Sequence, residues 1–338
     1  MQHLLVLNHG SSSLKYAVFK VDNKTLGKQV LAGEANLKEI TQKIKNYNIS
    51  YIGFRVVHGG QEFVRPTKID NTFLNNILKY NNLAPLHNPP TIALIKQAKT
   101  IWPQAQMIAC FDTAWSKDLK PEAYLYALPL KFYKNYGIRK YGFHGLSHES
   151  VTLEAAKILK KKLNKLNIIT CHLGAGSSIT WFKDGRVMDT TMGFSPNEGL
   201  VMATRTGDLP PDVVLYLVTQ LKMSLENIQD LINKKSGLFG LAGTGEMLKI
   251  WNNKSPKARL AFDIYIYRAK KYLASYLGQN KKLDALVFTG KIGYNNSQIR
   301  KLILKDLALP KNTKILAIDS KEIQNIALKT IQCLKMNK

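Results

Sequence analysis

The sequence predicts an α/β protein with two duplicated domains around a central cleft. One observation is an internal repeat: an apolar run at 4–7 enters a Gly/Ser turn and a second run at 14–20, and the same pattern returns at 168–183. The copies lie about half of the 338-residue chain apart, which favours two homologous domains over a solenoid of short repeats. The other observation is the alternation of strand-like and helix-like segments, which is typical of partly parallel sheets. Ligands in such folds bind at the carboxyl ends of strands.

Strands are predicted from short apolar or β-branched runs bounded by turn residues. They cover 4–7, 14–20, 51–58, 106–111, 168–171, 179–183, 283–289 and 314–318. Helices are predicted from apolar residues that recur every three or four positions. They cover 88–100, 148–166, 212–233, 257–277 and a segment that begins at Ser297.

The composition excludes several classes of protein. Hydrophobic residues make up 45% and charged residues 21%, which is typical of globular proteins. The three cysteines form neither a CxxC pair nor a disulfide framework, so we expect buried thiols in a reducing compartment. No apolar run approaches the ~18 residues of a membrane span, and the start of the chain lacks the basic flank of a signal peptide. We therefore expect a cytoplasmic protein without a membrane partner.

The charge is strongly basic, with 49 Lys and Arg against 23 Asp and Glu and a formal net charge of +26. The lysines are spread over the whole chain, and the densest run, 160–162, is expected on the solvated face of an amphipathic helix. We find no RNP-like, zinc-finger or helix-turn-helix signature. The charge thus favours small anionic ligands, and no specific nucleic-acid partner is expected.

Glycine-rich turns follow the first strand of each repeat. Backbone N–H groups in such turns approach phosphate closely, and Lys15 and His172 accompany them. A plain hairpin would explain one such turn, but two matching turns favour a polyphosphate cradle. A third loop at 290–295, between a strand and the helix from Ser297, suits a nucleotide or phosphate only weakly.

Charged residues in apolar surroundings are further candidates. Arg55 and Arg205 lie within such segments, where each could form a structural ion pair or bind carboxylate or phosphate oxygens. Asp112 ends a strand and could hold Mg²⁺ or a proton, or simply cap a helix. Four histidines suit phosphate better than zinc; they are His87, His144, His148 and His172.

With these residues assembled, the sequence resembles the acetate kinase family, from 4 to about 329. The motifs are Asn8-x-Gly10-Ser11-Ser12-Ser13-Leu14-Lys15, Arg55-Val56-Val57-His58-Gly59-Gly60, Leu83-Ala84-Pro85-Leu86-His87-Asn88-Pro89, Phe111-Asp112-Thr113-Ala114, Tyr141-Gly142-Phe143-His144-Gly145 and Arg205-x-Gly207-Asp208. The resemblance implies actin-like (ribonuclease H-like) domains, as in sugar kinases and heat-shock ATPases. It assigns 1–113 with 324–338 to an N-terminal domain and 114–323 to a nucleotide-binding domain. It also implies a homodimer.

The resemblance further implies reversible, direct in-line phosphoryl transfer from ATP to acetate with Mg²⁺ or Mn²⁺, which gives acetyl phosphate and ADP. The implied catalytic residues are Asp112, His144 and Arg205. The implied acetate site comprises Arg55 for the carboxylate and Val57, Leu86, Phe143 and Pro196 for the methyl group. The implied metal residues are Asn8 and Glu322, together with Asp112. The implied nucleotide and phosphate site comprises Ser12, Lys15, His87, His172, Leu173, Gly174, Ala175, Gly176, Glu246, Met247, Leu248, Lys291, Ile292, Gly293, Tyr294 and Asn295.

Several positions depart from the family pattern, chiefly around the implied adenosine site. Lys291 replaces a glycine, Tyr294 a glutamate, Leu248 an arginine and Ala175 an asparagine. An ordinary ATP site with local repacking and a site with a changed phosphoryl donor, such as pyrophosphate, both stay open. A kinase for propionate or another short acid is the nearest alternative. A catalytically weakened regulatory nucleotide-binding protein is the remote one.

Overall fold

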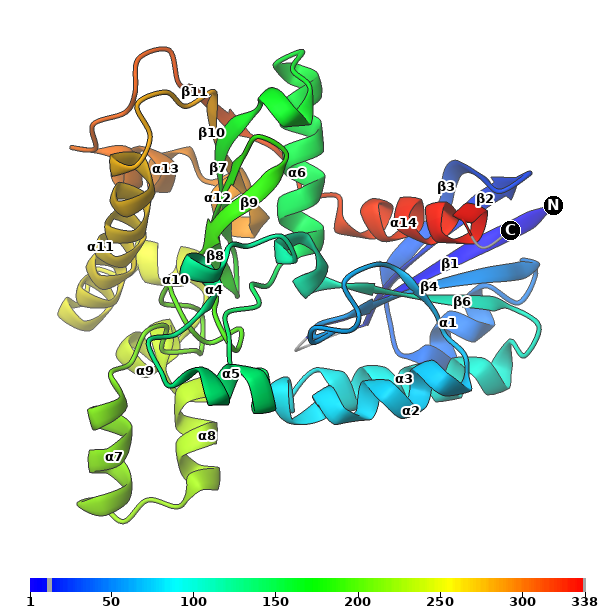
Figure 1. Cartoon of the computed structure of the whole chain (residues 1–338), viewed down its shortest axis with the longest axis horizontal. Helices are drawn as coiled ribbons and strands as arrows, with labels where there is room; N and C mark the ends of the chain where they lie inside the picture. The colour runs from blue at the N-terminus through cyan, green and yellow to red at the C-terminus, as the bar shows by residue number, and fades with distance from the viewer. Residues whose placement is uncertain (11–13, 337–338) are drawn as a thin grey trace. The chain divides into compact units, whose positions relative to one another are not determined.

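The computed structural model describes residues 1–10 and 14–336 and divides the chain into two compact units (Figure 1). Unit 1 comprises Met1–Lys117, Phe143–Ser150 and Lys321–Lys338, and unit 2 comprises Asp118–Gly142 and Val151–Ser320. The chain thus returns to unit 1 with its last segment. The predicted division into two homologous domains, 1–113 with 324–338 and 114–323, remains a prediction.

Unit 1 is built on one mixed sheet in the order β3-β2-β1-β4-β6-β5. Its strands are β1 (Gln2–His9), β2 (Leu14–Asp22), β3 (Thr25–Glu34), β4 (Ile49–Val56), β5 (Thr67–Lys68) and β6 (Gln106–Phe111). The first three strands are antiparallel, whereas β4 runs parallel to β1 and β6 runs parallel to β4. Its helices are α1 (Leu37–Lys43), α2 (Asn71–Ile77), α3 (Asn88–Ile101), α14 (Glu322–Met336) and the 3₁₀ segments Leu78–Leu83 and Asp112–Ser116.

Both faces of this sheet are buried, which explains why β1 reads as a continuous apolar run. Because successive side chains of a strand point to opposite faces, Leu5 and Leu7 pack in the cluster with α1, α2 and α3. Leu4 and Val6 pack on the other face in the cluster with α14. The returning helix therefore completes the core of unit 1.

Unit 2 has a second mixed sheet in the order β11-β10-β7-β8-β9. Its strands are β7 (Asn167–Leu173), β8 (Ser177–Lys183), β9 (Arg186–Thr190), β10 (Ala285–Thr289) and β11 (Lys314–Ala317). Its helices are α4 (Pro121–Tyr124), α5 (Leu130–Tyr136), α7 (Pro211–Thr219), α8 (Leu225–Lys234), α9 (Gly237–Ala242), α10 (Met247–Asn252), α11 (Pro256–Gly278), α12 (Gly290–Asn295), α13 (Ser297–Leu304) and the 3₁₀ segment Leu163–Lys165. The unit boundary falls within α6 (Gly145–Ile158). No helix in the described ranges has the length and apolarity that crossing a membrane requires.

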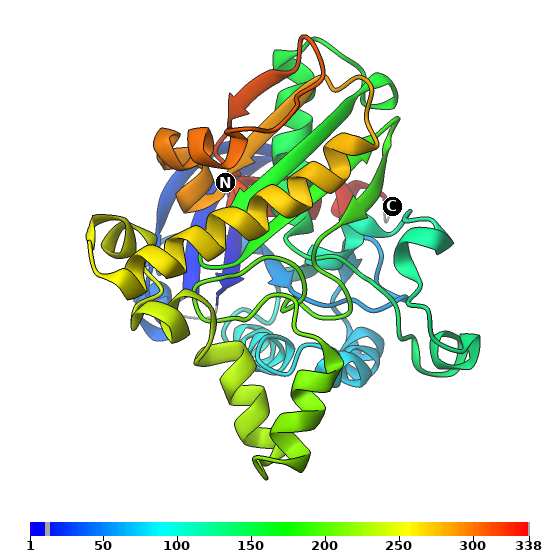
Figure 2. The same ribbon diagram turned by 90° about the vertical axis from the view of Figure 1, so that its left-hand side faces the viewer.

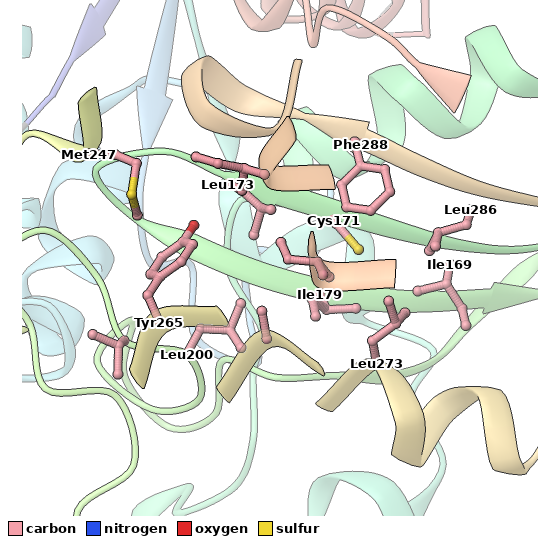
Figure 3. Packing of buried hydrophobic residues seen from close by; sticks show 14 of the residues in the cluster. Ile169, Cys171, Leu173, Ile179, Leu200, Met247, Tyr265, Leu273, Leu286 and Phe288 are labelled. Atoms are coloured by element: carbon pink, nitrogen blue, oxygen red, sulfur yellow. The ribbon is translucent and has the colours of Figure 1, made fainter. Parts of the chain in front are cut away.

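The two sheets confirm the predicted duplication strand by strand. In each, two consecutive antiparallel strands are followed by a third antiparallel strand, and two parallel strands lie on the other side of the first strand. Strands β1, β2, β3, β4 and β6 thus correspond to β7, β8, β9, β10 and β11. Helix α11 lies across one face of the second sheet (Figure 2), where Tyr265 and Leu273 pack with Ile169 and Ile179 (Figure 3).

Three local predictions were wrong. The predicted helix 212–233 is two helices, α7 and α8, separated by a turn in which Lys222 has a left-handed φ of 53°. Helix α6 begins at Gly145 and ends at Ile158, so the lysines at 160–162 lie beyond it; Lys160, with φ 52°, follows the helix end. The predicted loop 290–295 forms the short helix α12.

The prediction of buried thiols is confirmed. Cys110, Cys171 and Cys333 are all buried and in the thiol form. Burial raises the pKa of Cys110 to about 12, because an apolar environment disfavours the thiolate. The cysteines are therefore part of the cores.

Helix α14 packs closely on the sheet of unit 1 at Gly53, and this contact generates a prediction. A Cβ added at Gly53 would lie 2.3 Å from Thr330 Oγ1 and 3.1 Å from Ile326 Cγ2. We expect Gly53→Ala to lower the free energy of unfolding by about 1–3 kcal/mol, as overpacking does. Gly278→Ala is the control, because a Cβ there has open space and alanine favours the helix by up to about 1 kcal/mol. Equal stability of both variants in urea unfolding would contradict the close packing of α14.

Candidate active site

Predicted site residues lie at one edge of the unit 1 sheet. Strands β1, β4 and β6 run parallel, so their carboxyl ends meet at the same edge. Asn8 lies near the end of β1, Arg55 lies near the end of β4, and Asp112 directly follows β6. The fold thus brings together three residues that are distant in the sequence.

Arg55 is the centre of a hydrogen-bonded network at this edge. Its Nη2 lies 2.6 Å from Asp112 Oδ2, and its Nε donates to the two oxygens of the same carboxylate at 3.0 and 3.2 Å. Arg55 Nη1 donates to Asn8 Oδ1 at 3.3 Å. Asn8 Nδ2 in turn donates to Glu322 Oε2 at 3.4 Å, from the first residue of α14. The predicted carboxylate-binding arginine and the three predicted metal residues therefore form one continuous group.

The network carries an excess of negative charge. Burial raises the pKa of Asp112; the Arg55 charge opposes this rise, and the nearby charge of Glu322 adds to it. Burial disfavours the charged guanidinium, but Asp112 and Glu322 outweigh burial and hold the pKa of Arg55 above its ordinary value. Arg55 is therefore cationic, and its single positive charge interacts with the two carboxylates of Asp112 and Glu322. A further cation would relieve the remaining repulsion.

These residues fit a magnesium ion. Mg²⁺ prefers oxygen ligands and is usually held by one or two carboxylates together with substrate phosphates. Asp112, Glu322 and the Asn8 amide offer this donor set within one network. Within 1–10 and 14–336, no three His, Cys, Asp or Glu side chains form a metal-binding cluster. The donor set therefore suits an ion that substrate oxygens also hold, rather than a closed protein cage.

The start of α6 packs directly on the Asp112 segment. A Cβ added at Gly145 would lie only 2.0 Å from the Asp112 carbonyl oxygen, so the close approach requires glycine. His144, which precedes the helix with a left-handed φ of 55°, is thereby held next to this contact and is buried. Sequence reasoning predicted His144 but gave no reason for the glycine that follows it.

The predicted methyl-group residues of unit 1 differ in burial. Val57 and Phe143 are buried, whereas Leu86 is 44% exposed. The Phe143 ring packs edge-on against His58, with the ring centroids 5.4 Å apart. The His58 backbone N–H donates to Asn88 Oδ1 at 3.1 Å, and Asn88 Nδ2 donates back to the His58 carbonyl at 2.9 Å. Both residues belong to motifs of the family resemblance, but sequence reasoning gave them no role.

The structure describes two of the three predicted phosphate residues of unit 1. Lys15 is exposed and lies opposite Asn8 in the β1–β2 pairing. His87 is half-buried and directly precedes α3. Ser12 lies outside the described residues.

In unit 2, the predicted phosphate turn joins β7 to β8. His172 is half-buried beside the end of β10, and Leu173 is buried. The Gly174 N–H donates to the Gly176 carbonyl at 2.9 Å, which closes the turn on itself. Ala175, at its tip, is exposed.

Unit 2 brings the three predicted nucleotide segments side by side. The Ala203 N–H donates to the Ala175 carbonyl at 2.9 Å, and a Cβ added at Gly245 would lie 3.0 Å from Ala203. A Cβ added at Gly174 would lie 3.8 Å from the Lys291 nitrogen. The turn 172–176, the loop 243–248 and the helix 290–295 thus converge through backbone contacts.

Helix α12 packs against the end of β7. Gly290 has a φ of 75°, and a Cβ there would lie 2.6 Å from the Leu173 carbonyl oxygen, so this approach also requires glycine. Lys291 is exposed and Tyr294 is 42% exposed. Ile292 packs on the core, and the helix is completed by Gly293 and Asn295.

The segment 246–248, where α10 begins, contributes one core residue and two exposed residues. Met247 is buried and packs with Leu173 (Figure 3), so its side chain is part of the core. Leu248 is 60% exposed. Glu246 is exposed and forms a 2.6 Å ion pair with Lys249, one turn along α10. Sequence reasoning could not distinguish the buried residue because all three lie in a short turn-rich segment.

The last two predicted residues lie together in unit 2. Arg205 Nη1 donates to the Pro196 carbonyl oxygen at 2.5 Å. Both belong to the segment 191–210 between β9 and α7, and both are half-buried. The guanidinium is therefore anchored within its own loop.

The chain is similar to known proteins in both sequence and structure. The acetate kinase of Proteus mirabilis is 40% identical over 349 residues, which covers 90% of this chain and 86% of that protein. A solved propionate kinase from Francisella tularensis superposes with a TM-score of 0.87 at 35% identity, covering 98% of this chain and all of that one. Porphyromonas gingivalis acetate kinase superposes with a TM-score of 0.85 at 30% identity, covering 99% of this chain and all of that one.

These neighbours share the duplicated, actin-like α/β fold with this chain. The family model described as the acetokinase family matches residues 28–327, and this range contains the predicted residues from Arg55 to Glu322. The chain therefore belongs to the acetokinase family.

Proposed function

We propose that this protein is an acetate kinase, which transfers a phosphoryl group reversibly between ATP and acetate. The observation that carries the proposal is the Arg55 network at the strand ends of unit 1, in which a half-buried guanidinium contacts the buried Asp112. Asp112 holds the guanidinium through Nε and Nη2, and Asn8 holds it through Nη1. The terminal Nη1–Nη2 edge would bind a small carboxylate, because a guanidinium binds two carboxylate oxygens in parallel. Family membership supports the same reaction.

The acceptor needs no general base, because acetate is already an anionic nucleophile. Arg55 would orient the carboxylate, and Asp112 would hold the guanidinium plane through its two contacts with Nε and Nη2. The buried side chains of Val57 and Phe143 would face the methyl group. In the forward direction, one acetate oxygen forms a bond to the γ-phosphorus as the bond between phosphorus and ADP oxygen breaks.

Charge stabilisation would supply most of the catalysis. The transferring phosphoryl group spreads negative charge over its equatorial oxygens, so cationic and N–H donors around it lower the barrier. We assign this role to His144 and Arg205. The turn 172–176, with Ser12, Lys15 and His87, would contact the phosphates, and the segments 246–248 and 291–295 would contact the nucleoside.

We propose that Asp112, Glu322 and Asn8 hold the Mg²⁺ or Mn²⁺ ion that accompanies ATP. The ion supplies charge neutralisation at the phosphates when it is bound. Asp112 would thus orient Arg55 and also contribute to the metal site. This double use is consistent with the surplus of negative charge around it.

Two variations on this function have specific support. The similarity to a solved propionate kinase keeps propionate or another short acid open, because one methylene in an apolar pocket changes binding by only about 1–3 kcal/mol. The exposed side chains of Lys291, Tyr294 and Leu248 keep a changed phosphoryl donor open. The remote alternative is a catalytically weakened regulatory nucleotide-binding protein.

We further propose a cytoplasmic homodimer that associates through α7. Helix α7 is fully described and contains no buried residue, yet it is apolar along its length. Leu215 and Tyr216 are 58% and 57% exposed, and Leu221 and Leu225 beyond it are 56% and 71% exposed. An exposed apolar surface of this kind is typical of a protein interface. Helix α8 lies beside α7 and extends the surface (Figures 1 and 2).

The first prediction of the proposed function concerns the reaction and its donor. We expect acetate and Mg²⁺ to give acetyl phosphate, trapped as the hydroxamate, with ATP as the best donor among ATP, GTP and pyrophosphate. Propionate, assayed in parallel, measures the choice of acid. Activity with pyrophosphate alone would establish the changed donor. Folded protein that is inactive with every donor and both acids would refute the kinase proposal.

The second prediction concerns Arg55. Arg55→Lys keeps the charge but loses the fork, so we expect the KM for acetate to rise about 10- to 100-fold, as for the loss of a charge-assisted hydrogen bond. Arg55→Ala should also lower the free energy of unfolding by about 3–5 kcal/mol, because it leaves Asp112 buried without its partner. Arg65→Ala, which removes an exposed arginine of the same unit, is the control. An unchanged KM in both Arg55 variants would exclude carboxylate binding by Arg55.

The third prediction concerns association. Leu215→Asp introduces a charge into the apolar surface of α7, so we expect light scattering to show a dimer for the unmodified protein and a monomer for the variant. Leu260→Asp on α11 is the control, because Leu260 is equally exposed at 57%. A monomeric unmodified protein, or a dimer that survives Leu215→Asp, would argue against this interface.

A further inference from the structure

The segment 191–210, which carries Arg205 and Pro196, has no helix or strand of its own. A guanidinium that stabilises a transferring phosphoryl group must be held in place, and an irregular segment needs other contacts to achieve this. Two half-buried carboxylate–tyrosine pairs of unit 2 supply such contacts. They involve Asp208 with Tyr272 and Glu198 with Tyr126.

Asp208 fixes the segment just after Arg205. Its Oδ1 accepts the Gly199 N–H at 2.8 Å, and its own N–H donates to the Gly199 carbonyl at 3.0 Å. Its Oδ2 accepts the hydroxyl of Tyr272, which belongs to the long helix α11. Asp208 therefore ties the two limbs of the segment together and ties both to a helix of the core.

Glu198 fixes the segment near Pro196. Its Oε2 accepts the Tyr126 hydroxyl and, at 3.3 Å, the Phe194 N–H. The Phe194 N–H also approaches the Tyr126 oxygen at 2.8 Å. A Cβ added at Gly193 would lie 1.7 Å from Glu198 Oε2, so the carboxylate packs directly on the backbone.

The two pairs bracket the Arg205–Pro196 hydrogen bond. Asp208 lies three residues after Arg205, and Glu198 lies two residues after Pro196. Burial, together with the carboxylate partners, raises the pKa of both tyrosines, so the phenols stay protonated and remain donors. In the hydrogen bonds of the described residues, the two pairs contact the segment 191–210. Outside that segment they contact no residue that we assign to acetate, metal or nucleotide.

We propose that Tyr272 and Tyr126, acting through Asp208 and Glu198, are positioning residues that set the place of the Arg205 guanidinium during phosphoryl transfer. This inference rests on the proposed kinase function and on the assignment of Arg205. The tyrosine hydroxyls would act through the two carboxylates and not by contact with substrate. Their loss should therefore lower kcat and leave acetate and nucleotide binding nearly unchanged.

The test is Tyr272→Phe, which removes one hydroxyl and keeps the ring. We expect kcat to fall about tenfold or more, because small misplacements of a catalytic group carry costs of this size, and both KM values to stay within about twofold. Tyr51→Phe is the matched control: Tyr51 is a buried tyrosine of unit 1 whose hydroxyl donates to Gln2 Oε1 at 3.0 Å. Both variants lose one tyrosine hydrogen bond, but only Tyr272→Phe should lower kcat.

A double-mutant cycle isolates the route of the effect. If Tyr272 acts through Arg205, then adding Tyr272→Phe to Arg205→Lys should lower kcat by less than about twofold beyond Arg205→Lys alone. A full tenfold loss in that background would overturn the proposal. If Tyr272→Phe does not fold, Tyr126→Phe takes its place in the same cycle with the same expectation.

The outcomes also separate this inference from the function on which it rests. An unmodified protein without kinase activity, or an Arg205→Lys variant with full activity, would refute the proposed function or the role of Arg205. An active protein with an impaired Arg205→Lys variant and a Tyr272→Phe variant that equals Tyr51→Phe would refute only the positioning role.

Discussion

A half-buried guanidinium at the carboxyl ends of three parallel strands is the constraint on which the site of unit 1 depends. Arg55 lies in an apolar strand, where an unpaired charge would be prohibitively costly, so the fold must supply acceptors at that point. Asp112 and Asn8 do so from the two neighbouring strands. The cluster is therefore coupled to the strand order β1-β4-β6, since another order would leave Arg55 without its partners.

The same constraint extends to the helices that meet this edge. Glu322 joins the network only because α14 returns to unit 1, and that return depends on the small Gly53 beneath Thr330. The close approach of α6 to the Asp112 carbonyl likewise depends on Gly145. Gly53 thus determines how near α14 comes to the sheet, and Gly145 determines how near α6 comes to the Asp112 carbonyl. The charged site therefore depends on these two close packing contacts.

Much of this arrangement could be predicted from the sequence, because strand ends carry readable signals. The repeated strand–turn–strand units predicted the duplicated sheets, and an arginine in an apolar run predicted a buried ionic site. What could not be predicted depends on contacts between distant residues. Asp208 and Tyr272 are 64 residues apart, and nothing in either segment indicates the other. The break between α7 and α8 was missed because the apolar period continues across it, although Lys222 adopts a left-handed backbone there.

The duplicated sheets also show how one topology serves two kinds of chemistry. In unit 1, β4 and β6 carry Arg55 and Asp112 at their carboxyl ends, which concentrates charge. In unit 2, the corresponding strand β10 ends at Thr289 and turns through Gly290 into α12. A cationic side chain is suited to bind a small carboxylate, whereas the backbone donors of glycine turns are suited to bind phosphate. Because a glycine turn has no side chain to adjust, cationic assistance in unit 2 must come from elsewhere in the chain. In the proposed mechanism, Arg205 would supply this assistance from a segment that is held by tyrosine–carboxylate pairs outside the repeated strands.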